Sequence, residues 1–262
     1  MSAAAMHVAK TGLNAQQMKM QVIANNLANV NTTGFKRDRV NFESLLYQVS
    51  KTAGAETADG SSLTSSSSVG TGVKIVSTQK LYTQGSLIST ENAMDVAIDG
   101  AGFFQVLMPD GRIGYTRNGS FSPNSDGILT TSSGYVLQPQ IQIPPNVTEV
   151  NIAGNGRVTA LLAGSPEPTE LGQLTISNFV NPRGLQSIGE SFAVESTASG
   201  PPEEGVPIEG GFGKLVQGYL EGSNVNVVQQ LVDMIETQRA YEVSSKAITA
   251  SDEMMRYINN NL

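Results

Sequence analysis

Residues 227–262 read VVQQLVDMIETQRAYEVSSKAITASDEMMRYINNNL, and apolar side chains recur in this stretch every seven residues. The track consists of Val227, Met234, Tyr241, Ile248, Met255 and Leu262, and it is joined by Leu231. This spacing is typical of the a and d positions of a coiled-coil seam. A helix over about 225–262 would be roughly 55 Å long at a rise of 1.5 Å per residue, which is longer than a compact domain of this size requires.

The seam of this predicted helix is interrupted by polar residues. The second heptad position is occupied by Gln238, Ser245, Asp252 and Asn259. A two-stranded coil with so polar a seam would be weak, because buried polar groups at these positions cost stability. We therefore interpret the helix as one that packs against several neighbours in a bundle formed on assembly.

The N-terminal segment repeats the same design. Residues 2–30 are predicted to form one long helix. Met6, Leu13, Met20 and Leu27 recur in it every seven residues, and Ala9, Ile23 and Val30 lie three positions after three of them. The period ends in turn-forming residues at 31–34, where we expect the helix to stop.

Three asparagines, Asn25, Asn26 and Asn29, lie in the last turns of this predicted helix. Asn is a poor residue for a helix interior, and a buried Asn in a coiled-coil seam fixes register. One hypothesis is that they set the stagger between neighbouring subunits. The alternative, which the sequence supports as well, is that they begin the termination of the helix.

The central region follows a different pattern. Residues 50–72 are rich in Ser, Thr, Ala and Gly and read as a flexible segment or a plain linker. From about residue 73 to 219, short apolar runs alternate with turn signals such as Pro109-Asp110-Gly111, which indicates an all-β sandwich or barrel. The predicted fold class is α+β, with a coiled-coil core of 1–35 and 222–262, an extended linker at 36–72 and a β domain at 73–221.

Composition excludes several classes of protein. Cysteine is absent and His7 is the single histidine among 262 residues, so neither disulfides nor a thiolate metal site are expected, and we predict no metal or cofactor. A net charge of -7 without a basic stripe argues against nucleic acid. Asp95 and Asp99 share one face of a predicted strand, but an exposed strand edge explains them as well as catalysis does, so we predict no catalytic residue.

The sequence also bears on location. No run approaches the roughly 20 apolar residues of a membrane span, so we expect no membrane insertion. The N-terminus lacks the pattern of a cleaved signal peptide, since polar residues from Lys10 onward interrupt it. Taken alone, these features predict a cytosolic protein.

Four segments resemble the bacterial flagellar rod, hook and hook-associated proteins. They are ANNLANVNTTGFK at 24–36, DVAIDGAGFF at 95–104, YTRNGSF at 115–121, and SNVNV at 223–227 followed by MIETQRAYE at 234–242. The chain length and the segments at 42–48 and 70–73 are most similar to the members that build the distal rod, and the proximal rod and hook members are the alternatives. The run from Ser61 to Ser68 departs from the pattern.

The resemblance implies a structural subunit that polymerises into a helical tube and transmits torque, with the terminal helices on the inside. It implies export without a cleaved signal and a place in the flagellar basal body, which overrides the cytosolic prediction. Implied neighbours are proximal rod proteins, the hook protein, the P-ring and L-ring proteins and a rod cap. Two functions of other classes are the alternatives: an enzyme acting on cell-wall glycan, and a secreted fibrous adhesin.

Overall fold

The structure, a computed structural model, describes residues 2–51, 66–164 and 167–260. The chain divides into two compact units. The helical unit comprises residues 1–27, 38–79 and 226–262, and the β unit comprises residues 28–37 and 80–225. The predicted boundaries differ from these, because residues 28–37 and 222–225 belong with the strands of the β unit, whereas residues 38–79 belong with the helices.

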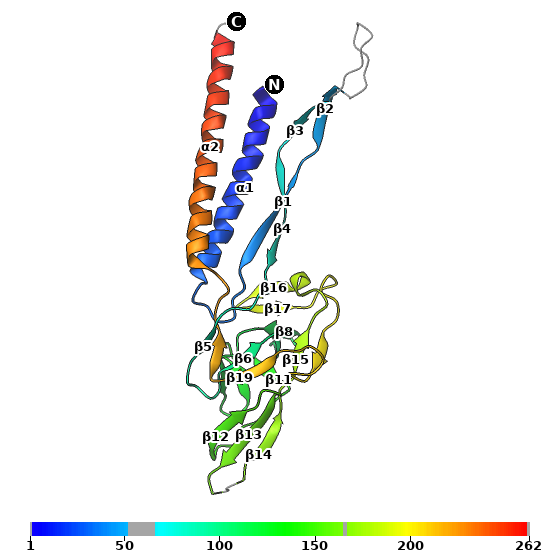
Figure 1. The fold of residues 1–262 in the computed structure, drawn as a ribbon, viewed down its shortest axis with the longest axis vertical. Helices are drawn as coiled ribbons and strands as arrows, with labels where there is room; N and C mark the ends of the chain where they lie inside the picture. The colour runs from blue at the N-terminus through cyan, green and yellow to red at the C-terminus, as the bar shows by residue number, and fades with distance from the viewer. Residues whose placement is uncertain (1, 52–65, 165–166, 261–262) are drawn as a thin grey trace. The chain divides into compact units, whose positions relative to one another are not determined.

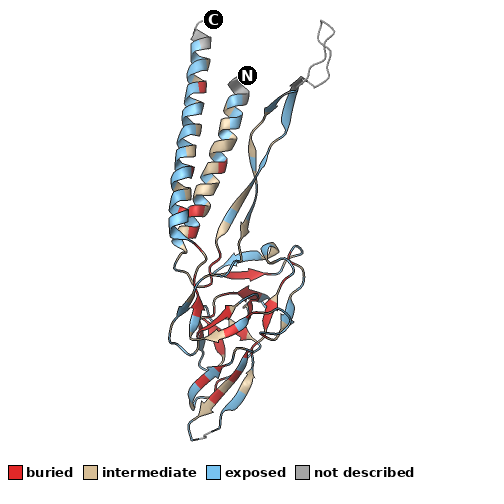
Figure 2. Ribbon diagram, viewed as in Figure 1, coloured by how far each residue is buried: buried red, intermediate tan, exposed pale blue. Residues whose placement is uncertain are grey.

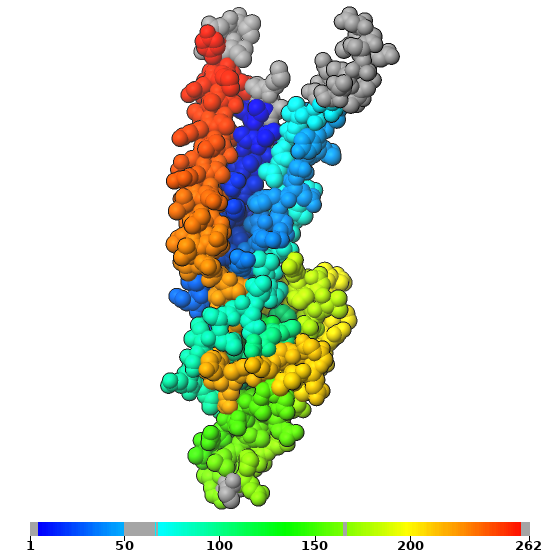
Figure 3. All heavy atoms as spheres, in the orientation of Figure 1, coloured from blue at the N-terminus to red at the C-terminus, as the bar shows by residue number. Residues whose placement is uncertain are grey.

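Two antiparallel helices dominate the helical unit. α1 (Ser2–Ala28) and α2 (Val227–Asn260) lie side by side, with both ends of the chain at the same end of the pair (Figure 1). Gly12 lies opposite Ser244, and Asn26 is hydrogen-bonded to Gln230, so equal steps along the two helices keep them in register. Figure 3 shows the atoms of α2 following those of α1. Pairing as a supercoiled coiled coil stays a prediction.

A ribbon of strands completes the helical unit. β1 (Asp38–Ser44) neighbours β4 (Val73–Lys80), and β2 (Tyr47–Lys51) pairs with β3 (Ser67–Gly70). The ribbon touches α1, since the Val73 N–H donates to Thr11 Oγ1 over 3.3 Å. Of the segment predicted as a linker, the described residues 38–51 and 66–72 are extended but largely paired, because apolar residues such as Val40, Phe42 and Val49 alternate with polar ones. Residues 61–65 of the Ser-rich run lie outside the described residues.

The strands of the β unit form sheets of different sizes, and their strand pairs in the described residues are antiparallel. The seven-stranded sheet has the order β16 (Gln186–Gly189), β17 (Phe192–Val194), β8 (Ile113–Thr116), β7 (Phe104–Leu107), β11 (Val136–Gln138), β10 (Leu129–Thr131) and β9 (Phe121–Pro123). A three-stranded sheet contains β12 (Val147–Ile152), β13 (Arg157–Leu162) and β14 (Thr169–Gln173). The two-stranded ladders are β15 (Ile176–Asn178) with β18 (Glu203–Gly205), β19 (Lys214–Gln217) with β6 (Val96–Asp99), and β20 (Tyr219–Glu221) with β5 (Leu87–Ser89). One 3-10 turn, η1, spans Pro182–Gly184.

The turn predicted at Pro109-Asp110-Gly111 joins β7 to β8. The Gly111 N–H donates to the Met108 carbonyl over 2.9 Å, and Gly111 has a φ of 80°, a conformation that glycine adopts without steric cost. The predicted turn is confirmed, and the two strands form a hairpin with Leu107 opposite Ile113 and Phe104 opposite Thr116.

Apolar side chains from several of these sheets form the core of the β unit. Phe104, Ile98, Val106, Val158 and Ile176 are fully buried in one cluster, and buried residues concentrate among the strands (Figure 2). A second cluster holds Phe103, Tyr115 and Phe179. The α+β class is therefore confirmed as helices at both ends and a β-rich region between them, whereas sandwich or barrel packing stays a prediction.

Helix α2 begins with a side-chain cap. The Asn226 Oδ1 accepts a hydrogen bond of 3.1 Å from the Gln229 N–H, which is the first half of a capping box. The Gln229 side chain instead donates to Asp233. We expect Asn226→Ala to lower the free energy of unfolding by about 1 kcal/mol, because one amide at the helix start loses its acceptor. Thermal unfolding followed by far-UV circular dichroism checks this, with Gln229→Ala as the control. An equal loss in both variants would contradict a role for the cap.

Candidate assembly site

The predicted interface residues of α1 are divided between the interior and the surface of the helical unit. Ile23 and Asn26 are buried, and Asn25 is exposed. The remaining five are partly buried: Met6, Leu13, Met20, Leu27 and Asn29. Most of the apolar track on α1 therefore keeps accessible surface within the single chain.

The predicted track of α2 is more exposed. Val227, Leu231 and Tyr241 are classed as exposed. The half-buried members are Met234, Ile248 and Met255, and Leu262 lies outside the described residues. The single chain thus leaves much of this apolar track uncovered.

The buried track of α2 is a different one, and it is polar. Gln230, Thr237 and Ser251 are buried and Ser244 is half-buried, so a buried or half-buried polar side chain recurs every seven residues, three positions after the apolar track. The hydroxyl groups of Thr237 and Ser251 donate to the carbonyls of Asp233 and Ala247, 2.6 and 2.8 Å away, which satisfies them within the helix. The sequence reasoning missed this track, although its seven-residue period is visible in the sequence.

A second apolar face lies on the opposite side of α2. Val228, Leu231, Val232 and Ile235 follow the spacing of one helix face, and they are 71%, 44%, 45% and 50% exposed. At 3.6 residues per turn, Val228 points about 160° away from Gln230. Of these four residues the sequence reasoning named only Leu231. We call this set the outer stripe, and an apolar stripe left open to solvent is typical of an interaction surface.

Asn26 ties the parts of the helical unit together. Its Nδ2 donates to the Asp38 carbonyl over 2.9 Å and to Gln230 Oε1 over 3.0 Å, and its Oδ1 accepts from the Asp38 N–H over 2.8 Å. The side-chain amide thus pairs with both backbone groups of Asp38, as a neighbouring strand would. Asn26 joins the end of α1 to the start of β1 and to the first turn of α2. It performs this role within the chain, which the hypothesis of a stagger between subunits did not foresee.

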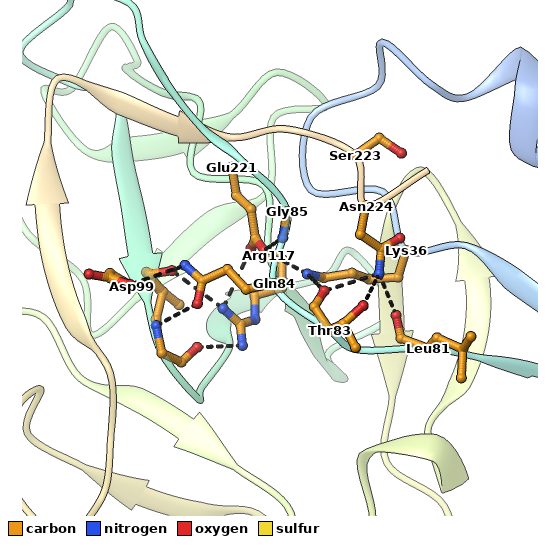
Figure 4. A network of polar contacts seen from close by, with 12 residues as sticks. Lys36, Leu81, Thr83, Gln84, Gly85, Asp99, Arg117, Glu221, Ser223 and Asn224 are labelled. Carbon is orange, nitrogen blue, oxygen red and sulfur yellow. Dashed lines mark hydrogen bonds and ion pairs between the residues drawn. The ribbon is translucent and has the colours of Figure 1, made fainter. Parts of the chain in front are cut away.

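In the β unit, three charged side chains meet in the interior (Figure 4). Lys36 Nζ lies 2.6 Å from Glu221 Oε1 and donates to the Thr83 carbonyl over 2.8 Å. Arg117 Nη1 lies 3.4 Å from Glu221 Oε2, and its Nη2 donates to the Gly100 carbonyl over 2.8 Å. The side chains of Lys36 and Glu221 are 2% and 0% exposed. We call Lys36, Arg117 and Glu221 the charged triad.

The triad holds two cations and one carboxylate away from water. Burial lowers the pKa of Lys36 below its usual value, although the Glu221 carboxylate acts to raise it. Burial likewise lowers the pKa of Arg117, whose guanidinium carbon also lies 5.3 Å from the centre of the Phe103 ring. The carboxylate of Glu221 accepts a further hydrogen bond from the Gly85 N–H over 2.8 Å. Glu221 is therefore the member on which the placement of both cations depends.

Hydrogen bonds to backbone groups hold residues 34–37 and 221–224, the first and last segments of the β unit, beside the triad. The Gly34 N–H donates to the Glu221 carbonyl over 2.8 Å, and a Cβ on Gly34 would lie 2.5 Å from the Asn118 nitrogen, so only glycine fits there. Asn224 accepts from the Arg37 N–H over 2.7 Å and donates to the Leu81 carbonyl over 2.7 Å. Lys36 and Arg117 lie in the quoted signature segments and Glu221 lies two residues before another, but the sequence reasoning did not connect them.

The two carboxylates considered for catalysis, those of Asp95 and Asp99, make structural contacts. Asp95 is buried and accepts from Asn92 Nδ2 over 3.2 Å, and Asp99 pairs with Lys214 over 3.2 Å. Within the described residues, no three potential metal-binding side chains gather together. In the same part of the chain, neither helix combines the length and the apolar character that crossing a bilayer requires.

Comparison with known proteins identifies the class first. Residues 6–36 match the family described as Flagella basal body rod protein, residues 97–160 match Flagellar hook protein FlgE/F/G D1 domain, and residues 216–261 match Flagellar basal body rod FlgEFG protein C-terminal. The two terminal matches carry the helices, Asn26, Lys36 and Glu221, and the central match carries Arg117.

Individual relatives narrow the class. The flagellar basal-body rod protein FlgG of Buchnera aphidicola (from Schizaphis graminum) is 51% identical over 96% of this chain and 97% of its own length. The FlgG protein of Agrobacterium fabrum is 44% identical over 98% and 99% of the two chains. A FlgF protein of Caulobacter vibrioides is 33% identical over 94% and 93%. This chain belongs to the family of flagellar basal-body rod proteins FlgG.

Proposed function

We propose that the chain is a structural subunit of the distal part of the flagellar rod. In this proposal copies polymerise through their terminal helices into a helical tube that transmits torque from the motor to the hook. The single observation that carries the proposal is the outer stripe of α2, an apolar helix face that the chain itself leaves exposed. The higher identity to the FlgG relatives than to the FlgF relative supports the distal position over the alternatives in the proximal rod or hook.

The helical unit provides a physical reason for assembly. The face of α2 that is buried beside the chain's own α1 carries the polar track. Apolar side chains remain accessible on two other parts of the surface of α2. Burying one such side chain fully contributes about 1.5–3 kcal/mol, so a helix bundle formed by several subunits would gain from covering both. The proposed partners are further copies, proximal rod proteins, the hook protein, the P-ring and L-ring proteins and the rod cap. The proposed location is the rod between periplasm and outer membrane, reached without a cleaved signal.

The same proposal assigns no chemistry to the chain. Asp95 and Asp99 are engaged in contacts that hold strands and turns, and the charged triad is buried under backbone and aromatic groups. An enzyme acting on glycan would need accessible carboxylates in a cleft, and nothing in the contacts of these residues favours one.

Placing a charge on the outer stripe tests the proposal. Leu231→Asp and Ile235→Asp, and Tyr241→Asp on the neighbouring track, are expected to leave the single chain folded and to prevent its stable incorporation into rods. The reason is that burying an unpaired carboxylate costs several kcal/mol. The measurement is the amount of the chain in isolated basal bodies, together with swimming of cells that carry only the variant.

Ala247→Asp is the control, because Ala247 is exposed on the same helix and, at 3.6 residues per turn, lies on neither the outer stripe nor the apolar track. Far-UV circular dichroism of each purified chain shows whether its helices are intact. Normal rods from the Leu231 and Ile235 variants, with folded chains, would refute the role of the outer stripe.

A further inference from the structure

The charged triad joins parts of the chain that are far apart in sequence. Lys36 and Glu221 are separated by 185 positions, and Arg117 and Glu221 by 104. Glu221 ends β20, which pairs with β5, and the preceding strand β19 pairs with β6. The carboxylate thus reaches the interior as part of the last segment of the β unit, residues 214–225.

Until that segment is in place, closure of the β unit would bring two cations together without a carboxylate. The Nη1 group of Arg117 and the Nζ group of Lys36 both point at the same carboxylate. The two side chains also donate hydrogen bonds to the backbone carbonyls of Thr83, Ile98 and Gly100. Carbonyl groups solvate a cation but do not cancel its charge. In an interior of low dielectric, two such charges oppose collapse, because their repulsion is far stronger there than in water.

We propose that the charged triad makes the closure of the β unit conditional on the arrival of residues 214–225. The strands up to Val194 form the large sheet, but Lys36 and Arg117 keep the region around β5 and β6 from packing until Glu221 neutralises them. The triad would then act as a check that the last strands of the β unit are present before that unit becomes rigid. This inference does not depend on rod assembly, and it holds or fails on the single chain.

A series of full-length chains attached to the ribosome tests this order of events. The whole chain is followed by a C-terminal tether of increasing length and held on a stalled ribosome, and resistance of the β unit to a protease is measured at each length. In the wild type, we expect resistance to appear only at tethers that let residue 221 leave the exit tunnel. Resistance at shorter tethers would overturn the proposal.

The triple variant Lys36→Met, Arg117→Met, Glu221→Gln distinguishes the effect of the buried charges from the effect of the last strands on the order of folding. Gln keeps an oxygen for the Gly85 N–H, and Met keeps most of the volume of the long side chains. Buried ion clusters replaced by apolar groups of similar volume can leave a protein folded. We expect resistance to appear at tethers shorter by a length comparable to segment 214–225. An unchanged threshold would show that the last strands, rather than the charges, impose the order.

If the triple variant does not fold, a pair of full-length variants tests whether unpaired cations keep the β unit from closing. Glu221→Gln leaves both cations unpaired, and adding Lys36→Met to it removes one of them. We expect the double variant to resist the protease at least tenfold longer than Glu221→Gln alone. A double variant that is cut as fast or faster would overturn the proposal. Glu170→Gln, which breaks the exposed ion pair with Arg157, is the control and should behave as the wild type.

Discussion

Glu221→Gln is expected to lower the free energy of unfolding of the β unit by about 3–5 kcal/mol, the range found when one partner of a buried ion pair is removed. The substitution keeps the size of the side chain and an acceptor for the Gly85 N–H, so the loss comes from charge. It leaves Lys36 and Arg117 buried without a counterion, and burial already lowers the pKa of both.

The measurement is denaturant unfolding followed by near-UV circular dichroism. In the β unit, the rings of Tyr82 and Phe179 pack against Phe103, and Tyr115 packs against Phe179, so the signal of these aromatic side chains reports the packing of the unit. Glu170→Gln removes a carboxylate from an ion pair that is more than half exposed, and it should cost less than about 1 kcal/mol. Similar losses in both variants would show that the triad is no more important than a surface pair.

Lys36→Met should cost less than Glu221→Gln, because it leaves Arg117 and Glu221 as a balanced pair. This order follows from the two cations and one carboxylate of the triad. If Lys36→Met proved the more damaging of the two, the surplus of positive charge would not be what governs the stability of this region.

Asn26→Asp is expected to destabilise the helical unit by about 3 kcal/mol or more. The new carboxylate has no N–H to donate, so the Asp38 carbonyl and Gln230 Oε1 would each face an oxygen in place of their present donor. An unsatisfied buried polar group costs about 1–3 kcal/mol, and a buried charge costs more. Guanidinium unfolding followed by far-UV circular dichroism, which reports α1 and α2, measures the change.

Asn25→Asp is the matched control for this substitution. Asn25 is the preceding residue of the same helix and is exposed, so the same change of charge should alter stability by about 0.5 kcal/mol or less. The pair also tests the hypothesis that these asparagines set the stagger between subunits. If Asn26→Asp left the isolated chain intact and affected only assembled rods, Asn26 would act between subunits rather than within one.

The sequence by itself determined the features that depend on neighbours along the chain. The seven-residue tracks predicted both long helices, and the turn residues at 31–34 placed the end of α1 within a few residues of Ala28. Pro109-Asp110-Gly111 predicted the turn that joins β7 to β8. In each case a local rule of backbone geometry or helix periodicity is sufficient, because the groups involved lie within a few residues of one another.

The tertiary structure alone decided which side chains meet across the chain. The apolar track of α2 suggested the buried seam, but the structure buries Gln230 and Thr237 beside α1 and leaves Leu231 and Tyr241 exposed. The tracks differ by three residues, and periodicity cannot tell which of two faces a partner helix covers. Likewise, no local pattern reveals that Lys36, Arg117 and Glu221 share one interior site, because their attraction exists only after three distant segments of the chain have brought the charges out of water.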